Sequence, residues 1–210
     1  MKKYKHLDDL LISFRNRESI IQSRLKEFQS VPQKKYFYEL LYCLMTPQSS
    51  AVNAGKAQKK FELANFQNIE FDPIQILFDK EHYIRFHRTK AKHILEMKEH
   101  FSEILPVLIS EQSATEKREW LVKNVNGLSY KEATHFLRNI GKNEGLTILD
   151  RHILKNLRHH GVINTLPKSL TKKIYFSIEK KFLKFAAEIG ISGDELDLVF
   201  WSNETGEILK

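Results

Sequence analysis

A short turn between two helical segments constrains the fold of this chain more than any other feature. The sequence Ser113-Ala-Thr-Glu116 has the pattern of a capping box, in which the serine and the glutamate bond each other's backbone amides at a helix start. We predict a helix over about 114–125, a turn at 126–129 and a second helix over about 130–140. So short a turn folds the second helix back on the first, so the segment is a helix–hairpin–helix.

The rest of the chain also favours helices. Only 8 of the 210 residues are glycine and 5 are proline, as expected for helices joined by short turns. Apolar residues recur at steps of three, four and seven, which is the spacing of one helix face. We predict an all-α fold. Further helices are expected at about 6–29, from Phe37 to Leu44, at about 49–65, 73–81, 88–105 and 151–160, after Pro167, and at 193–202. A new helix can begin after Pro47 with Gln48 in its first turn, and Asp150 is the expected N-cap of the helix over 151–160.

The charge of the chain favours an acidic partner. Its 34 Lys and Arg residues exceed 26 Asp and Glu residues, which gives a formal charge of +8. Nucleic acid is the first candidate, although many basic proteins bind no polyanion. The basic run Arg85, His87, Arg88, Lys90 and Lys92 could follow a phosphate backbone, or it could be a solvated helix face.

Several classes of protein are excluded. Cys43 is the single cysteine, so internal disulfides and cysteine-held zinc or iron–sulfur clusters are absent. The histidines at 82, 87, 93 and 100 lack a convincing ligand spacing, and we expect neither a metal nor a cofactor. The sequence has no signal-peptide pattern and no bilayer-spanning apolar run, so we expect a cytoplasmic protein without a membrane partner.

The hairpin itself offers a means of binding a phosphodiester backbone. Backbone amides at a helix start bind a phosphate without reading any base, and Gly127 permits the close approach. An ordinary helical turn is the alternative.

The chain resembles the helix–hairpin–helix DNA glycosylases, and among them the type-2 8-oxoguanine DNA glycosylase/AP lyases. The resemblance is carried by Thr46-Pro47-Gln48-Ser49, Val125 to Ala133, His135 to Gly141, Leu149 to Ile153, and Trp201 through Gly206 to Lys210. It implies two helical subdomains flanking a DNA-binding cleft. We expect one over 30–150 and the other over 1–29 with 151–210, in a monomer acting on double-stranded DNA that contains 8-oxoguanine.

The resemblance makes Lys131 the nucleophile and Asp150 its carboxylate partner. The chemistry requires such a pair, because expelling a base from C1′ builds positive charge on the sugar that a carboxylate can stabilise. The amine must be unprotonated to attack, and the resulting Schiff base lets the 3′ phosphate leave by β-elimination. Taken alone, Lys131 could be a solvated lysine and Asp150 a plain N-cap. Ser129 stands where the hairpin commonly has a second glycine, which puts phosphate affinity in doubt more than catalysis.

Further residues are assigned by the same resemblance. A purine must leave the duplex before attack, and Gln48 is the candidate to fill the gap, unless it only starts a helix. His152 is expected to hold a phosphate, or to be structural. Base recognition falls to Phe86, Asp197, Trp201 and Lys210, with core packing as the alternative for the two aromatic residues.

Two rival interpretations remain open. One keeps the fold and the lysine but acts on an oxidised pyrimidine or an abasic site. The other is a non-catalytic DNA-binding protein that uses the hairpin only for phosphates, with salt-sensitive binding and no strand scission.

Overall fold

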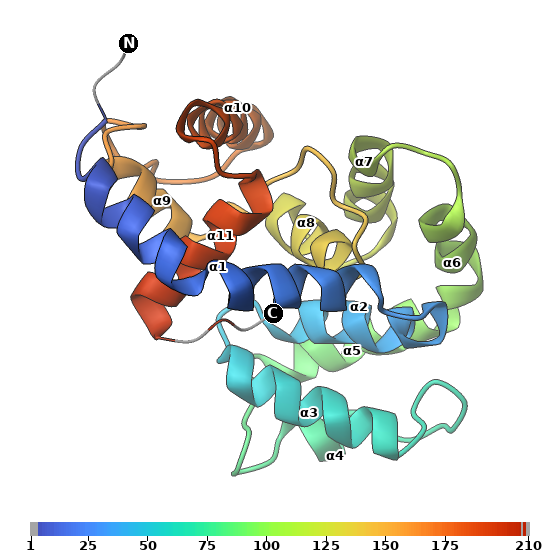
Figure 1. Ribbon diagram of the computed structural model, residues 1–210. Coiled ribbons are helices and arrows are strands. Elements are labelled where there is room, and N and C mark those ends of the chain that lie inside the picture. Colours follow the sequence, from blue (N-terminus) through green and yellow to red (C-terminus); the bar gives the residue numbers. More distant parts are fainter. Residues whose placement is uncertain (1–3, 207, 209–210) are drawn as a thin grey trace. The chain divides into compact units, whose positions relative to one another are not determined.

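The chain divides into two compact units, which we describe separately. A computed structural model describes residues 4–206 and 208. One unit contains residues 1–29 and 143–210, and the other contains residues 30–142. Within the described residues all regular structure is helical, which confirms the predicted all-α class (Figure 1).

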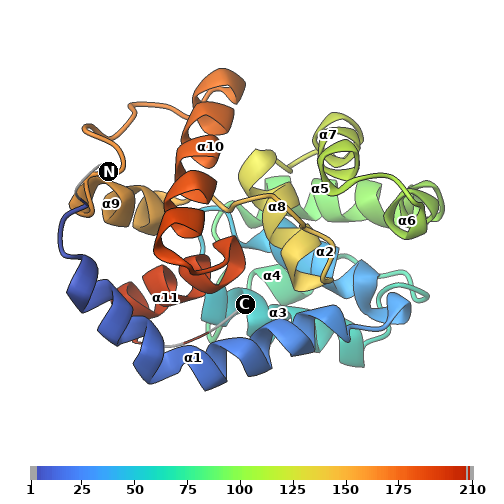
Figure 2. The ribbon, with the colours of Figure 1, turned by 45° about the horizontal axis from the view of Figure 1, so that its top comes forward.

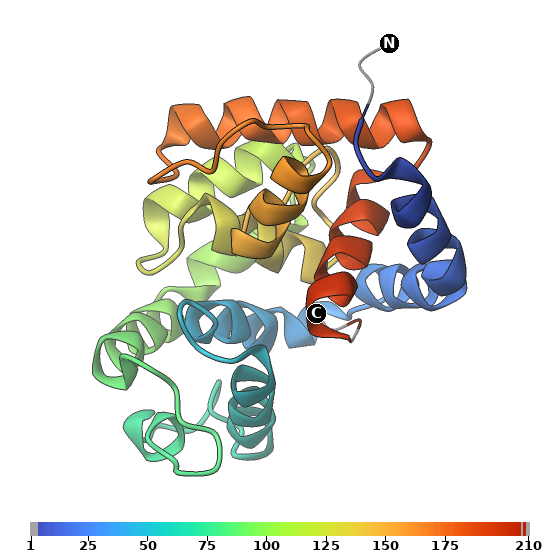
Figure 3. The same ribbon diagram turned by 90° about the vertical axis from the view of Figure 1, so that its left-hand side faces the viewer.

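The first unit is built from both ends of the chain. Its helices are α1 Leu7–Gln29, α9 Arg151–His159, α10 Lys172–Ile189 and α11 Gly193–Thr205. Helix α11 packs against the other three, and Figure 3 shows it beside α1. The apolar stripe of α1 buries Leu10, Ile21 and Phe28, as its spacing predicts.

The second unit surrounds one buried helix. Its elements are η1 Gln33–Lys35, α2 Tyr36–Met45, α3 Ala51–Leu63, α4 Ile74–Leu77, α5 His87–Glu99, α6 Phe101–Ile109, α7 Ala114–Asn124 and α8 Tyr130–Asn139. All ten residues of α2 are buried, and α3, α5 and α8 pack around it. Its one carboxylate, Glu39, accepts hydrogen bonds from Gln58 at 3.0 Å and Asn139 at 3.3 Å. These bonds offset the cost of burying the charge.

The boundary between the units differs from the predicted one near residue 150. Residues 143–149 belong to the first unit because they bond to its helices. The Asn143 side chain donates to Asp194 at 2.6 Å, and Tyr175 on α10 donates to the Thr147 carbonyl at 2.6 Å. Asp150 therefore lies in the first unit as well.

Two predicted helices were wrong in extent. The helix expected over 88–105 is broken at His100, where φ of −94° and ψ of 9° leave the helical region. The ring of Phe101 then packs edge-on against Phe37 at 5.1 Å. The helix expected over 73–81 ends at Leu77, because Asp79 starts a turn by accepting from the Glu81 amide at 2.8 Å.

Candidate active site

The predicted hairpin joins α7 to α8, which lie side by side (Figure 2). Gly127 has φ of +92°, a left-handed conformation that favours glycine. A Cβ at this position would lie 2.4 Å from His93 Nδ1 on α5. Both the backbone conformation and the close packing therefore require the glycine.

Ser129 begins α8 with a second capping box. Its backbone amide donates to Glu132 Oε2 at 3.3 Å, and its hydroxyl donates to the same oxygen. The residue that departs from the common glycine thus serves as the helix N-cap.

Lys131 lies in the first turn of α8 and is partly exposed. Its ammonium group bonds the other oxygen of Glu132, Oε1, at 2.9 Å. The Lys131 side chain is 29% exposed, whereas that of Glu132 is only 8% exposed. Burial raises the pKa of Glu132, but the Lys131 charge and the hydrogen bonds from Ser129 and Lys131 hold it below its usual value. Glu132 is therefore a buried carboxylate that stays ionised at neutral pH.

Lys90 is a buried lysine in the same cluster. Its Nζ donates to the Met45 carbonyl at 2.6 Å, the Pro47 carbonyl at 2.7 Å and Ser49 Oγ at 3.0 Å. These three bonds use all the donors of an ammonium group. Burial lowers the pKa of Lys90 to about 8, with Glu132 opposing the shift and Lys131 adding to it. Lys90 therefore fastens the segment 45–49 to α5 and interacts electrostatically with the Lys131–Glu132 pair.

This position corrects the interpretation of the basic run. We expected the run from Arg85 to Lys92 to be exposed, but Lys90 is only 5% exposed. Ile94 and Met97, four and seven residues further on, are buried with it, so Lys90 lies on the apolar face of α5.

The sequence predicted Gln48 in the first turn of a helix, but the structure places it in a loop. Its φ of +55° is left-handed, and α3 begins only at Ala51, with Ser50 as N-cap. Such a conformation costs a non-glycine residue about 1–2 kcal/mol, so surrounding contacts must hold it. The bonds from Lys90 to Pro47 and Ser49 supply these contacts.

Phe86 is brought close to this loop. The Arg85 amide donates to Ser49 Oγ at 3.0 Å, which joins the two segments. Phe86 itself has φ of +59°, is 50% exposed, and lies under the Arg85 guanidinium at 5.1 Å. A strained, exposed aromatic residue next to the segment that bonds Ser49 is unusual for core packing and agrees with a functional role.

In the other unit, Asp150 is the N-cap of α9, as predicted. Its Oδ1 accepts from the amides of His152 and Ile153, both at 2.8 Å. Neither bond uses Oδ2. His152 packs edge-on against Trp201 on α11 at 5.1 Å, and its Nδ1 lies 3.6 Å from Glu204. The structure thus brings His152 and Trp201 together.

The remaining predicted residues are less informative. Asp197, one turn before Trp201 on α11, is buried with 6% exposure. Lys210 lies outside the described residues. In the described part of the chain, the histidines, cysteine and carboxylates form no group that could hold a metal ion. Among the same residues, no helix is both long and apolar enough to span a bilayer.

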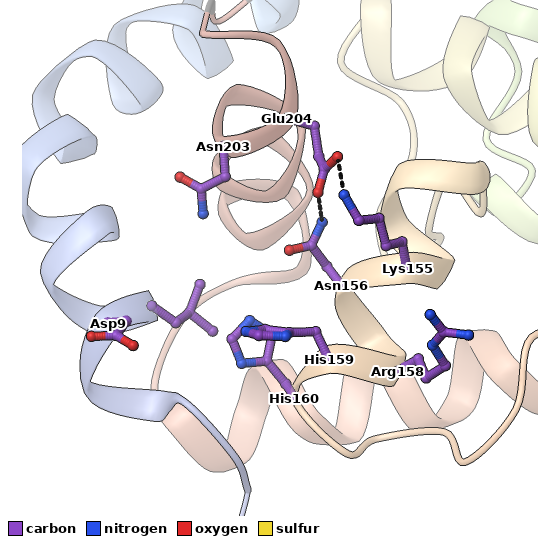
Figure 4. A pocket seen from close by; sticks show the side chains of 9 residues that line it. Asp9, Lys155, Asn156, Arg158, His159, His160, Asn203 and Glu204 are labelled. Atoms are coloured by element: carbon purple, nitrogen blue, oxygen red, sulfur yellow. Dashed lines mark hydrogen bonds and ion pairs between the residues drawn. The ribbon is translucent and has the colours of Figure 1, made fainter.

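A pocket of about 440 Å³ lies elsewhere in the first unit, between α1, α9 and α11. Figure 4 shows Glu204 bonded to Lys155 at 2.7 Å and to Asn156 at 3.5 Å at its edge. The pocket is lined by Asp9, Leu10, Lys155, Asn156, Arg158, His159, His160, Asn203 and Glu204. No predicted site residue lines it.

The helical units and the hairpin define the class of helix–hairpin–helix glycosylase folds, as solved structures show. The 8-oxoguanine DNA glycosylase of Thermotoga maritima has a TM-score of 0.85 at 30% identity, covering 97% of this chain and 98% of that one. The Methanocaldococcus jannaschii enzyme in complex with a 15mer DNA containing 8-oxoguanine also has a TM-score of 0.85 at 30% identity, covering 96% and 99%.

Sequence comparison identifies the family. The sequence model of 8-oxoguanine DNA glycosylase matches residues 21–191. The 8-oxoguanine DNA glycosylase/AP lyase of Fusobacterium nucleatum is 37% identical over the full length of both chains, and that of Korarchaeum cryptofilum is 37% identical over 91% of this chain and 90% of its own. The chain belongs to the 8-oxoguanine DNA glycosylase family.

Sequence reasoning missed two members of the candidate site. Glu132 follows Ser129 at the same spacing as Glu116 follows Ser113, so the capping-box pattern could have identified it. The helical spacing of Lys90, Ile94 and Met97 could have placed Lys90 on the buried face.

Proposed function

We propose that this chain excises 8-oxoguanine from double-stranded DNA and cleaves the resulting abasic site, with Lys131 as nucleophile and Asp150 as the stabilising carboxylate. The observation that carries the proposal is the lysine in the first turn after the hairpin, in a member of the 8-oxoguanine DNA glycosylase family. A relative named 8-oxoguanine DNA glycosylase/AP lyase matches its full length, which supports both activities.

In the first reaction the lone pair of Lys131 Nζ forms a bond to C1′ of the damaged nucleotide. The bond from C1′ to the base breaks, and its electron pair leaves with the base, which takes up a proton. Asp150 stabilises the positive charge that develops on the sugar. Its N-cap bonds to Oδ1 fix the carboxylate in one orientation without occupying Oδ2.

In the second reaction the sugar opens to a Schiff base between Lys131 and C1′. The Schiff base acidifies the C2′ protons, and loss of one of them expels the 3′ phosphate by β-elimination. The strand is cut, and water then releases the lysine. This sequence of steps explains how one amine can perform both activities.

The remaining residues of the proposed site bind DNA. The hairpin that carries Gly127 and Ser129 holds a phosphate at the start of α8, where the helix dipole is positive. Gln48 fills the gap left by the extruded base, and His152 holds a phosphate. Phe86, Asp197, Trp201 and Lys210 recognise the base, with the aromatic rings available for stacking. In this proposal the chain acts as a monomer.

Borohydride trapping tests the proposal. A duplex with one 8-oxoguanine is incubated with the protein and borohydride, which reduces the Schiff base to a stable adduct. We expect an adduct with the wild type and none with Lys131→Gln. Lys173→Gln, at an exposed position on α10, is the matched control and should form the adduct normally. An adduct that persists in Lys131→Gln would assign the nucleophile to another residue, and no adduct with the wild type would refute the proposed lyase.

A further inference from the structure

Glu132 performs two tasks with its two carboxylate oxygens. Oε2 accepts the backbone amide and the hydroxyl of Ser129, which closes the capping box of α8. Oε1 accepts the ammonium group of Lys131 at 2.9 Å. Adjacent residues on a helix normally point in different directions, so this pairing is a specific feature of the first turn.

Burial of the Glu132 carboxylate strengthens its effect on the Lys131 amine. The Glu132 side chain is 8% exposed, so solvent screens its charge poorly. A buried carboxylate in contact with an ammonium group favours the charged form of the amine. The charged form has no lone pair and cannot attack carbon.

We propose that Glu132 is a positioning residue that holds the protonated amine of Lys131 beside the hairpin and so sets the pH above which Lys131 attacks C1′. This inference rests on the proposed function. Before attack, the ammonium of Lys131 releases one proton to water while Glu132 stays ionised. Breaking the ion pair is therefore part of the activation of the nucleophile.

Of the other charged groups near the Lys131–Glu132 pair, Lys90 affects the protonation of the amine and the rest contact other residues. Lys90 on α5 repels the ammonium of Lys131 and attracts Glu132, so it opposes the effect of Glu132 on the amine. The titratable groups of the two other helices that pack on α8 engage different positions. On α7, Glu119 accepts from the Tyr130 hydroxyl at 3.0 Å and Arg118 donates to Thr134 at 3.2 Å. On α2, Glu39 bonds Asn139 and the Tyr42 ring contacts His135.

The test isolates the amine step by using a duplex with a preformed abasic site. There C1′ is an aldehyde, so attack by Lys131 forms the carbon–nitrogen bond and the aldehyde oxygen leaves as water. The rate of adduct formation with cyanoborohydride is measured under single-turnover conditions across a pH series. The readout is the pH at which the rate is half of its maximum.

Glu132→Gln keeps a residue that can close the capping box but removes the charge. We expect its half-maximal pH to lie below the wild-type value, because the opposite charge in direct contact with the amine at 2.9 Å is lost. Glu132→Asp keeps the charge and should remain close to the wild type. A purely structural role for Glu132 would lower the rate and leave the half-maximal pH in place.

The capping box at the start of α7 offers a matched control. Glu116 accepts the amide of Ser113 at 2.8 Å and its hydroxyl at 2.7 Å, at the start of α7. Glu116→Gln makes the same chemical change away from Lys131 and should leave the half-maximal pH unchanged.

Lys90→Met supplies a test of opposite sign, which also serves if Glu132→Gln does not fold. Below about pH 8, where Lys90 carries its charge, removal of the repelling charge should move the rising part of the rate profile toward higher pH. The inference is overturned if the Glu132→Gln profile coincides with that of the wild type, or if Lys90→Met moves the profile downward. If the wild type forms no adduct at any pH, the proposed function fails instead.

Discussion

Burial of the Lys90 ammonium should make the stability of this protein depend on pH in a recognisable way. Burial lowers the pKa of Lys90 in the folded state to about 8, from an ordinary value of 10.5. Between these two values the unfolded chain binds a proton at this position and the folded chain does not. The free energy of unfolding therefore rises with pH across this window, while below about pH 8 the cost of burying the charge is fully present.

The magnitude follows from the same two values. The difference between 10.5 and about 8 corresponds to at most about 3 kcal/mol. Lys90→Met removes the titrating group together with its bonds to Met45, Pro47 and Ser49. Each lost bond from a charged donor costs about 1.5–3 kcal/mol, so at pH 7 the two terms oppose each other. The pH dependence of the difference between the variants is therefore more informative than its value at one pH.

Urea unfolding of the wild type and of Lys90→Met, followed by circular dichroism from pH 7 to pH 10, measures this difference. We expect the wild type to gain up to about 3 kcal/mol relative to the variant over this range. Groups common to both proteins cancel in the comparison. Lys92→Met, at an exposed position on α5, is the control and should give a level difference. A level or falling difference for Lys90→Met would refute the assignment of a buried charge to Lys90.

Two further substitutions test the candidate site. Asp150→Asn keeps an equally good N-cap, so we expect the free energy of unfolding to stay within about 0.5 kcal/mol of the wild type. Single-turnover excision of 8-oxoguanine should fall by about 100-fold or more, because the stabilising charge is lost. An unchanged rate would show that Asp150 takes no part in the chemistry. Gly127→Ala places a Cβ 2.4 Å from His93 Nδ1 at φ of +92°, so we expect a loss of about 1–3 kcal/mol in stability and weaker binding to an undamaged duplex. Adding His93→Ala should recover the steric part of the loss only, and wild-type binding by Gly127→Ala would contradict the role given to the hairpin.

The sequence predicted correctly those helix ends that are determined by residues close to them in the chain. The capping box at Ser113, the N-cap at Asp150 and the left-handed Gly141 depend on residues within a few positions of one another. The long stripe of α1 depends only on the spacing of its apolar residues. These features were therefore readable without knowledge of the tertiary structure.

The features that sequence reasoning missed depend on residues far apart in the chain. Lys90 is buried because it bonds residues 45–49, and the left-handed Gln48 is held by those same bonds. The helix break at His100 accompanies the contact of Phe101 with Phe37. Residues 143–149 join the first unit through bonds to α10 and α11. None of these partners is implied by the local pattern of the segment itself.

The assembly of the first unit from both ends of the chain has a consequence for synthesis on the ribosome. Helix α1 emerges first, but its main packing partner, α11, is translated only after the whole of the second unit. Residues 30–142 can therefore complete their core during translation, while the apolar stripe of α1 has to wait. During this interval Leu10, Ile21 and Phe28 lack the helix against which α1 packs most extensively in the folded protein.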